Sequence, residues 1–491
     1  MPSAVMWFRR DLRLGDLPAL GLAAGAADAV VPLFVLDPRL YEPAGPNRRH
    51  FLACTLTQLD RQLAGNLVVR RGNPAEVVPA VAAEAGARTV AVTADFGPYG
   101  ARRDRAVAAA LGRQGAVLRA AGSPYLVEPG TLRSAGGGRF AVFTAYLRAL
   151  ERAGWAAPVP APPARFTRLR CDGGPDDLLG PHAQPGEHGL PAWWKDLPLG
   201  LAGHLPPAGE VAAHAALGRF VEHNLGTYAQ RRDNPGADAT SRLSAYLHFG
   251  SLHPRTVLEV VGTGSGADRL RTELAWRDFY ADVLWHHPRS AREPLQAFGR
   301  HLRWDSGAAA RRRFEAWATG TTGYELVDAA MRQLLQEGWV HNRARMVAAS
   351  FLVKDLHLDW RLGARWFMWH LVDGDLASNQ HGWQWVAGTG TDAAPFHRVF
   401  NPELQRERFD ADRTYVRRYA RAAAVDPAGG AGPEAADPGA PRRHAAVIDH
   451  ASERREALAR LAEARQSAAM GAELGGPRGV GRPGPGHREK S

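Results

Sequence analysis

One stretch of the chain places a carboxylate, an indole, a guanidinium and a phenol on a single helix face. Counted at i, i+3, i+4 and i+7, these residues are Glu273, Trp276, Arg277 and Tyr280. Such spacing aligns side chains on one side of a helix. The face could stack a nucleobase on the indole and bind its phosphate through the guanidinium. A core tryptophan beside a solvated charge cluster explains the same four residues equally well.

Two polar segments further along the chain combine arginines with aspartates. The first is His341-Asn342-Arg343-Ala344-Arg345-Met346, and the second is Asp373-Gly374-Asp375-Leu376-Ala377-Ser378-Asn379. A buried Arg–Asp pair beside Asp and Asn side chains could hold the amide edge of a heterocycle. Two aspartates one residue apart could instead bind a divalent metal, but the neighbouring Arg, Asn and Trp favour the interpretation without a metal.

Hydroxyl residues gather in Thr240–Ser244, after the turn Asn234-Pro235-Gly236 and before a helical pattern. Hydroxyls and unpaired backbone amides at a helix start suit a phosphate. Taken alone, a simple Ser/Thr helix cap is the commoner explanation.

Tryptophan is concentrated in the same half of the chain. Of the 14 tryptophans, ten lie between Trp276 and Trp385, interleaved with arginines. Core packing is the default role of any single tryptophan, but ten in one region exceed what packing alone leads us to expect.

The elements that must position these residues differ along the chain. Short apolar runs alternate with helical patterns up to residue 130, which predicts a parallel, Rossmann-like α/β sheet with right-handed crossovers. The expected strands are Ala4–Phe8, Val30–Leu36, Leu67–Arg70, Val90–Thr93 and Val117–Arg119, and the expected helices are Arg48–Leu63, Pro74–Ala85 and Arg102–Leu111. No G-x-G-x-x-G follows the first strand, which disfavours a nucleotide-fingerprint dehydrogenase.

Four regions follow from these patterns. We expect an α/β domain over residues 1–130, a Pro/Gly-rich connector over 131–210 and a mainly helical domain over 211–420. Residues 421–491 are rich in Ala, Gly, Pro and Arg. They predict a disordered tail in which Ala451–Arg465 could form an exposed helix.

Composition limits the class of protein. The 45% hydrophobic fraction and 23% charge are globular values, and the absence of an apolar run near ~18 residues predicts a soluble, cytoplasmic chain. With only 2 Cys, a disulfide framework and Cys-ligated clusters are excluded. The net charge of +11 suggests a polyanionic partner, although a generic solvated surface explains it equally well.

Together these segments resemble the DNA photolyase/cryptochrome family, and within it the class I cyclobutane pyrimidine dimer photolyases. The match begins at Trp7-Phe8-Arg9-Arg10-Asp11-Leu12-Arg13 and runs to about Tyr419. It is densest in Thr240–Ser244, Thr322–Met346 and Asp373–Pro402. The resemblance implies an N-terminal α/β domain that binds an antenna chromophore and an all-α C-terminal domain that binds FAD.

The resemblance also implies roles for residues around the flavin. Arg345 should pair with Asp373 beside the isoalloxazine, and Asn379 should face flavin N5. The full set implied to bind FAD is Tyr228, Thr240, Ser241, Arg242, Leu243, Ser244, Arg345, Asp373, Gly374, Asp375 and Asn379.

A second set is implied to bind DNA that contains cyclobutane pyrimidine dimers. Trp276 and Trp385 should wall an extruded dimer while Glu273 and Asn342 bond its edges, and arginines should contact phosphates. The set is Arg232, Glu273, Trp276, Arg277, Tyr280, Asn342, Arg343, Met346, Trp385 and Arg398. Met346 favours cyclobutane dimers, because (6-4) photolyases carry His at that position.

The implied reaction is light-driven repair by electron transfer from excited reduced FAD to the flipped-out dimer, with the electron returning after the ring splits. Glu273 and Asn379 should assist the reaction, and Trp383, Trp360 and Trp304 match the family's electron-transfer chain. The alternative is a cryptochrome-like blue-light photoreceptor with FAD. The dimer-pocket residues favour repair.

The antenna assignment rests on Asp95-Phe96-Gly97-Pro98-Tyr99-Gly100, which looks like the deazaflavin-binding subgroup. The Asn-Glu pair of folate binders is missing, so 8-hydroxy-5-deazaflavin is favoured over 5,10-methenyltetrahydrofolate. Two residues depart from the pattern: His248 replaces the subgroup's Lys, and Leu17 replaces the family's usual Asn. A monomer without a metal or a membrane partner is expected.

Overall fold

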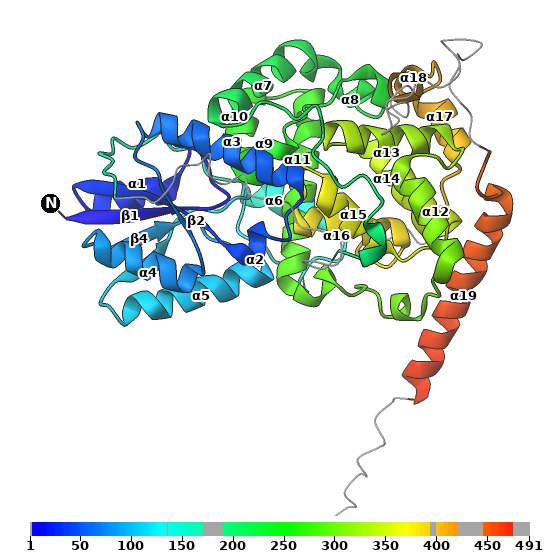
Figure 1. The fold of residues 1–491 in the computed structure, drawn as a ribbon, viewed down its shortest axis with the longest axis horizontal. Helices are drawn as coiled ribbons and strands as arrows, with labels where there is room; N and C mark the ends of the chain where they lie inside the picture. Colours follow the sequence, from blue (N-terminus) through cyan, green and yellow to red (C-terminus); the bar gives the residue numbers. More distant parts are fainter. Residues whose placement is uncertain (1, 135, 170–189, 393–398, 421–444, 475–491) are drawn as a thin grey trace, which may run out of the picture.

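A parallel sheet forms the core of the N-terminal part of the chain (Figure 1). In the computed structural model, which describes residues 2–134, 136–169, 190–392, 399–420 and 445–474, the strand order is β3-β2-β1-β4-β5. The strands are β1 Ser3–Phe8, β2 Ala29–Leu36, β3 Val68–Arg71, β4 Thr89–Val92 and β5 Val117–Ala120. All pair in parallel, so the predicted α/β fold is confirmed.

The central strands β1, β2 and β4 are buried on both faces, which explains their continuous apolar runs, whereas the edge strands β3 and β5 are more exposed. Along β1, Met6 and Phe8 belong to one hydrophobic cluster and Val5 and Trp7 to another, because successive side chains point to opposite faces. The covering helices are α1 Pro18–Ala26, α2 Pro38–Tyr41, α3 Pro46–Gln62, α4 Pro74–Glu84 and α5 Pro98–Gly112. Leu17 is the N-cap of α1 and makes no side-chain capping bond; it is buried in the core instead.

The rest of the described chain is helical (Figure 1). After α6 Phe143–Ala153 come α7 Glu210–His223, α8 Tyr228–Arg231, α9 Ser244–Phe249, α10 Pro254–Val261, α11 Ser265–His286, α12 Gly307–Thr319, α13 Glu325–Glu337, α14 Asn342–Ser350, α15 Trp360–His370, α16 Leu376–Ala387, α17 Pro402–Phe409 and α18 Thr414–Ala420. Short helical turns η5 Pro288–Ala291 and η6 Ala297–His301, and the π-helix η7 Phe351–Asp355, lie between them.

The two domains share one hydrophobic core. The cluster that contains Met6 and Phe8 of β1 also contains Leu217 of α7 and Phe279 of α11. The helical domain therefore packs directly on one side of the sheet assembly, which gives the two domains a fixed relative position.

Buried carboxylates of the long helix α11 hold the interdomain chain. Asp278 Oδ2 accepts a hydrogen bond from the backbone N–H of Leu126 at 2.7 Å, and Asp282 Oδ1 accepts one from Gly130 at 2.7 Å. Asp278 is 1% exposed. Burial raises its pKa to about 7, against the lowering effect of Arg277 and the backbone bonds.

This carboxyl should make stability depend on pH. Because its folded pKa of about 7 lies above the usual aspartate value of 3.8, the folded state keeps a proton that the unfolded chain releases, and stability falls as pH rises between these values. We expect the Asp278 contribution to change the free energy of unfolding by up to about 4 kcal/mol. Asp278→Asn should reduce the difference in free energy of unfolding between pH 5 and pH 8. Denaturant unfolding of the variant and the wild type at pH 5 and pH 8 measures this difference in free energy of unfolding.

The control is Asp268→Asn, on the same helix but with an exposed carboxylate paired to Arg271. It should keep the wild-type pH dependence. An equal pH dependence in the Asp278→Asn variant and the wild type would contradict the prediction.

The C-terminal helix is longer and better anchored than the sequence pattern predicts. Helix α19 spans His450–Leu474 and packs against η6 and η7. Its apolar strip, Ala457, Leu461 and Ala464, is buried. The helix expected over Ala451–Arg465 is present, but it is not wholly exposed, because the partners of this strip lie more than a hundred residues earlier in the chain. The rest of the tail that was expected to be disordered, 421–444 and 475–491, lies outside the described residues.

Charged side chains fasten α19 around Trp304. Arg460 donates to Asp305 Oδ1 at 2.7 Å and to the carbonyl of Arg303 at 3.2 Å, so it binds the residues on both sides of that tryptophan. Arg303 also pairs with Glu456 at 3.3 Å. Trp304 itself is half-buried.

Candidate functional site

One cavity of about 660 Å³ in the helical domain collects the predicted site residues. Its volume falls in the range of small-molecule and cofactor sites, roughly 300–1,000 Å³. Every residue implied to bind FAD lines it, and so does every residue implied to bind DNA except Arg398, which lies outside the described residues. Trp383 lines it too. Residues from 228 to 392 are thus brought to one place.

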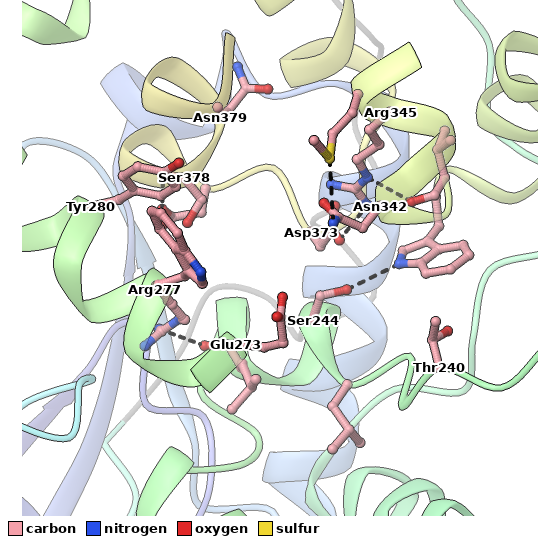
Figure 2. A pocket seen from close by; sticks show the side chains of 18 of the residues that line it. Thr240, Ser244, Glu273, Arg277, Tyr280, Asn342, Arg345, Asp373, Ser378 and Asn379 are labelled. Carbon is pink, nitrogen blue, oxygen red and sulfur yellow. Dashed lines mark hydrogen bonds and ion pairs between the residues drawn. The ribbon is translucent and has the colours of Figure 1, made fainter. Parts of the chain in front are cut away.

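An ion pair forms one side of the cavity (Figure 2). Arg345 Nη2 and Asp373 Oδ2 are 2.8 Å apart, and Arg345 Nε donates to the carbonyl of Val340 at 2.7 Å. The Asp373 side chain is 4% exposed, and its Oδ1 has no hydrogen-bond partner among the described residues. This buried acceptor suits a ligand that carries an N–H or O–H group.

The start of α16 supplies the opposite side, where Figure 2 shows Ser378 and Asn379. The Asn379 amide nitrogen donates to the carbonyl of Ala364 and to Gln380 Oε1, both at 3.0 Å, which leaves the amide oxygen for the cavity. Asp375 caps the helix by accepting from the backbone N–H of Ser378 at 2.9 Å.

A residue from the other domain reaches this wall. Arg10, which follows β1, pairs with Asp375 at 2.7 Å and donates to the carbonyl of His248 at 3.2 Å. Burial raises the pKa of Asp375, but the charges of Arg10 and Arg277 outweigh that effect and leave the pKa well below its usual range. His248 lines the cavity, and burial followed by the charge of Arg10 lowers its pKa well below the usual value. Asp375 is therefore ionised and His248 neutral.

The hydroxyl segment forms the floor. Thr240 Oγ1 is buried with no partner in the described part of the chain, and Ser244 Oγ accepts from Trp339 Nε1 at 3.2 Å. Arg242 adopts a left-handed φ of +49°, and its guanidinium pairs with Glu337 at 2.8 Å while lying 4.3 Å from the centre of the Trp339 ring. The Arg242 side chain is thus anchored by protein, whereas Thr240 is available to a ligand.

The helix face predicted on α11 forms the remaining wall. Glu273 pairs with Arg232, and the Tyr280 ring stacks on His381 with centroids 5.6 Å apart. Arg277 donates to the carbonyls of Pro124 at 2.7 Å and Leu247 at 3.2 Å. Its side chain is only 13% exposed, so this guanidinium mainly ties α11 to the interdomain chain.

Comparison with known proteins identifies the relationship. The description "FAD binding domain of DNA photolyase" matches residues 270–463, and "DNA photolyase" matches residues 4–164. A deoxyribodipyrimidine photo-lyase of Streptomyces griseus is 42% identical over 426 residues, which cover 85% of this chain and 89% of that protein. The chain belongs to the DNA photolyase/cryptochrome family.

Solved structures of the family agree. A bacterial class III photolyase from Agrobacterium tumefaciens has a TM-score of 0.81 at 32% identity, covering 95% of this chain and 98% of that one. An archaeal photolyase from Sulfolobus tokodaii, described with two FAD molecules, has a TM-score of 0.76 at 26% identity, covering 94% and 99%.

The cavity fits the flavin that the family's FAD-binding domain implies. Among the described residues, buried polar atoms without a partner line it on several sides, including Thr240 Oγ1, His248 Nδ1 and Asp373 Oδ1. Such atoms are costly to bury unless a ligand or water pairs with them. No group of three His, Cys, Asp or Glu able to hold a metal occurs in the described ranges, and none of the helices searched there is long and apolar enough to cross a membrane.

The tryptophans implied to carry electrons occupy one buried region. Trp383 and Trp360 are each 2% exposed and belong to the same hydrophobic cluster, against which the half-buried Trp304 packs. The Trp383 ring lies edge-on to Phe367 at 5.0 Å and to Trp317 at 6.1 Å between centroids. Sequence reasoning assigned no role to Trp317, and no spacing signal could have placed it there.

Other residues in or beside the cavity were also missed. Trp339 precedes the recognised segment 341–346 by two positions, so its closeness in sequence was a usable signal. Asp392 lines the cavity and ends the tryptophan-rich segment. Arg10 stands in the opening motif, but its contact with Asp375 joins residues 365 positions apart.

Proposed function

We propose that this protein is a light-driven DNA-repair enzyme, a deoxyribodipyrimidine photo-lyase of class I. It would split the carbon–carbon bonds of cyclobutane pyrimidine dimers, acting as a monomer in the cytoplasm. The observation that carries the proposal is the joining, in one cavity, of a buried polar side with an aromatic side formed by Trp276 and Trp385. The photo-lyase name of the relative in Streptomyces griseus supports it.

The polar side would hold FAD, which when bound supplies the light-excited electron donor. Thr240 and Ser244 would bind its phosphates, and Asp373 and Asp375 would accept from its polar edge. Arg345, which pairs with Asp373, would hold that side chain in place. The oxygen of Asn379 would face the flavin centre as an acceptor.

The aromatic side would hold the extruded dimer. Trp276 and Trp385 would stack against it, Asn342 and Glu273 would bond its exposed edges, and Met346 would fill the apolar gap between them. Asn342 is exposed and Met346 half-buried, as residues at the open end of a pocket should be. Arg232 and Arg343 would contact flanking phosphates, with Arg398.

Electrons that restore the reduced flavin would pass through Trp304, Trp360 and Trp383. The half-buried position of Trp304 and the complete burial of the other two support this order from the surface to the cavity.

The proposed antenna is 8-hydroxy-5-deazaflavin, bound by the α/β domain. Residues 95–100, which lead into α5, are fixed by bonds of Asp95, and this ordered segment supports a specific site. Asp95 accepts from the backbone N–H of Gly97 and pairs with Arg103, each at 3.0 Å. A Cβ at Gly100 would lie 2.2 Å from Asp95 Oδ2, so only glycine fits there. The absorption spectrum of the purified protein distinguishes a deazaflavin from a folate.

Illumination of the purified protein with dimer-containing DNA tests the proposed function. We expect dimers to disappear in light and to persist in an identical sample kept in darkness. The loss of dimers in darkness, or their persistence in light with reduced FAD bound, would contradict the proposal.

Glu273→Ala should separate catalysis from binding. Because Glu273 is expected to contact the dimer while phosphate contacts supply most of the affinity, repair yield should fall about tenfold, the value of a hydrogen bond to a charged group. Affinity for dimer-containing DNA should change less. Glu259→Ala, at an exposed site on α10, is the control. A larger loss of affinity than of repair yield would contradict the assignment.

A further inference from the structure

A residue of the connector between the domains packs behind Trp276, which lines the aromatic side of the cavity. Phe143, the first residue of α6, stacks on Trp276 with ring centroids 3.6 Å apart and planes 8° from parallel. Phe143 is 5% exposed and also meets Phe279 edge-on at 5.8 Å. One face of the Trp276 indole is therefore covered by Phe143, while Trp276 also lines the cavity.

The same segment is tied to the second aromatic wall. The carbonyl of Ala141 accepts from Thr391 Oγ1 at 2.7 Å and from the backbone N–H of Asp392 at 3.2 Å. These two bonds tie Ala141, two residues before Phe143, to the loop that follows α16, the helix that carries Trp385.

That loop is held from its other end as well. The backbone N–H groups of Thr389 and Gly390 donate to the carbonyl of Gln384, at 2.9 and 3.0 Å. Gln384 directly precedes Trp385 and is itself buried. The backbone position of Trp385 therefore depends on the segment of Ala141 and Phe143, because the loop 388–392 is hydrogen-bonded to both that segment and Gln384.

We propose that Ala141-Val142-Phe143 is a brace that sets the separation and orientation of Trp276 and Trp385, with Phe143 as a positioning residue for dimer recognition. The inference rests on the proposed function, because it assigns the gap between the two tryptophans to an extruded dimer. The brace holds the indole of Trp276 so that it is pre-ordered before the dimer arrives, which reduces the ordering cost of binding.

Binding measurements with two DNA duplexes test the brace. The duplexes have the same sequence, one with a single thymine dimer and one undamaged. The measured quantity is the dissociation constant for the undamaged duplex divided by that for the dimer-containing duplex. Phe143→Leu should lower this ratio about tenfold, the value of a lost aromatic stacking contact. Affinity for the undamaged duplex should stay unchanged. Phe143→Tyr, which keeps the stacked ring, should retain the wild-type ratio.

Phe140→Leu is the matched control. Phe140 is also 5% exposed and lies in the same segment, but its ring packs on Tyr146, with centroids 5.4 Å apart. Both leucine variants lose a similar buried ring, so thermal unfolding midpoints and flavin content should fall alike. Only Phe143→Leu should change the ratio. Equal ratios for the two variants would overturn the brace.

A double-mutant cycle shows whether Phe143 acts through Trp276. In a Trp276→Leu background, Phe143→Leu should have no further effect on the ratio, and a full additional loss would overturn the proposed route. A wild-type protein that binds both duplexes equally contradicts the proposed function itself. A wild type that discriminates while Phe143→Leu discriminates equally well contradicts only the brace.

Discussion

Replacing Trp383 by phenylalanine is expected to slow the light-driven reduction of oxidised FAD by more than about tenfold, a barrier increase above about 1.4 kcal/mol. Trp383 is buried and lines the cavity, so it is the tryptophan through which an electron from the other two would reach the flavin. A phenyl ring fills the same space but is much harder to oxidise than an indole. Absorbance of the flavin during illumination with an external reductant measures the rate.

Dimer splitting should respond differently to the same change. When the flavin is reduced chemically before illumination, no electron needs to enter through Trp383, and the variant should split dimers nearly as well as the wild type. Trp317→Phe is the control, because the Trp317 ring touches that of Trp383 edge-on but lies outside the proposed route. Photoreduction that is unchanged in Trp383→Phe, or lost only in Trp317→Phe, would contradict the assignment.

Asp373→Asn is expected to weaken FAD binding by about 100-fold, or about 2.7 kcal/mol. The substitution leaves the Arg345 guanidinium without its ionic partner in a buried setting, where breaking one side of a pair is strongly unfavourable. It also replaces the carboxylate oxygen Oδ1, which has no partner among the described residues. In asparagine this position holds either an amide oxygen, which is a weaker acceptor, or an amide nitrogen, which is a donor. Flavin content after purification and titration of the flavin-free protein with FAD measure the loss.

The control for this variant makes the same chemical change on the surface. Asp268→Asn removes an exposed carboxylate and should bind FAD as the wild type does. If Asp373→Asn kept a full complement of FAD at wild-type affinity, Asp373 would have no role in the flavin site.

Local patterns predicted the parts of the fold that local physics determines. The strands were found within one or two residues, the central ones because a parallel strand buried on both faces must be apolar throughout. The face of α11 was found because helical spacing brings Glu273, Trp276 and Tyr280 together. Helix α1 was missed, since Leu17 offers no capping signal before it.

Contacts between distant segments could not be predicted in this way. Arg10 meets Asp375, and Phe143 meets Trp276, only because the two domains share a core. The sequence pattern of 131–210 indicated nothing beyond a connector, although its Phe143 supports Trp276 in a wall of the cavity. The grouping of the site residues themselves followed from the family resemblance, and their individual roles remain predictions.

The anchoring of α19 changes where the functional unit ends. Arg303, Asp305 and Asp355 have ionic partners on this helix, and the match to the photolyase FAD-binding domain also extends to residue 463, inside it. A chain shortened to residue 420 would expose the surface under the helix, remove both carboxylate partners of Arg303 and leave Asp305 with Arg313 alone. Removing the tail would therefore also alter the surroundings of the residues on both sides of Trp304, the outermost tryptophan of the proposed electron route.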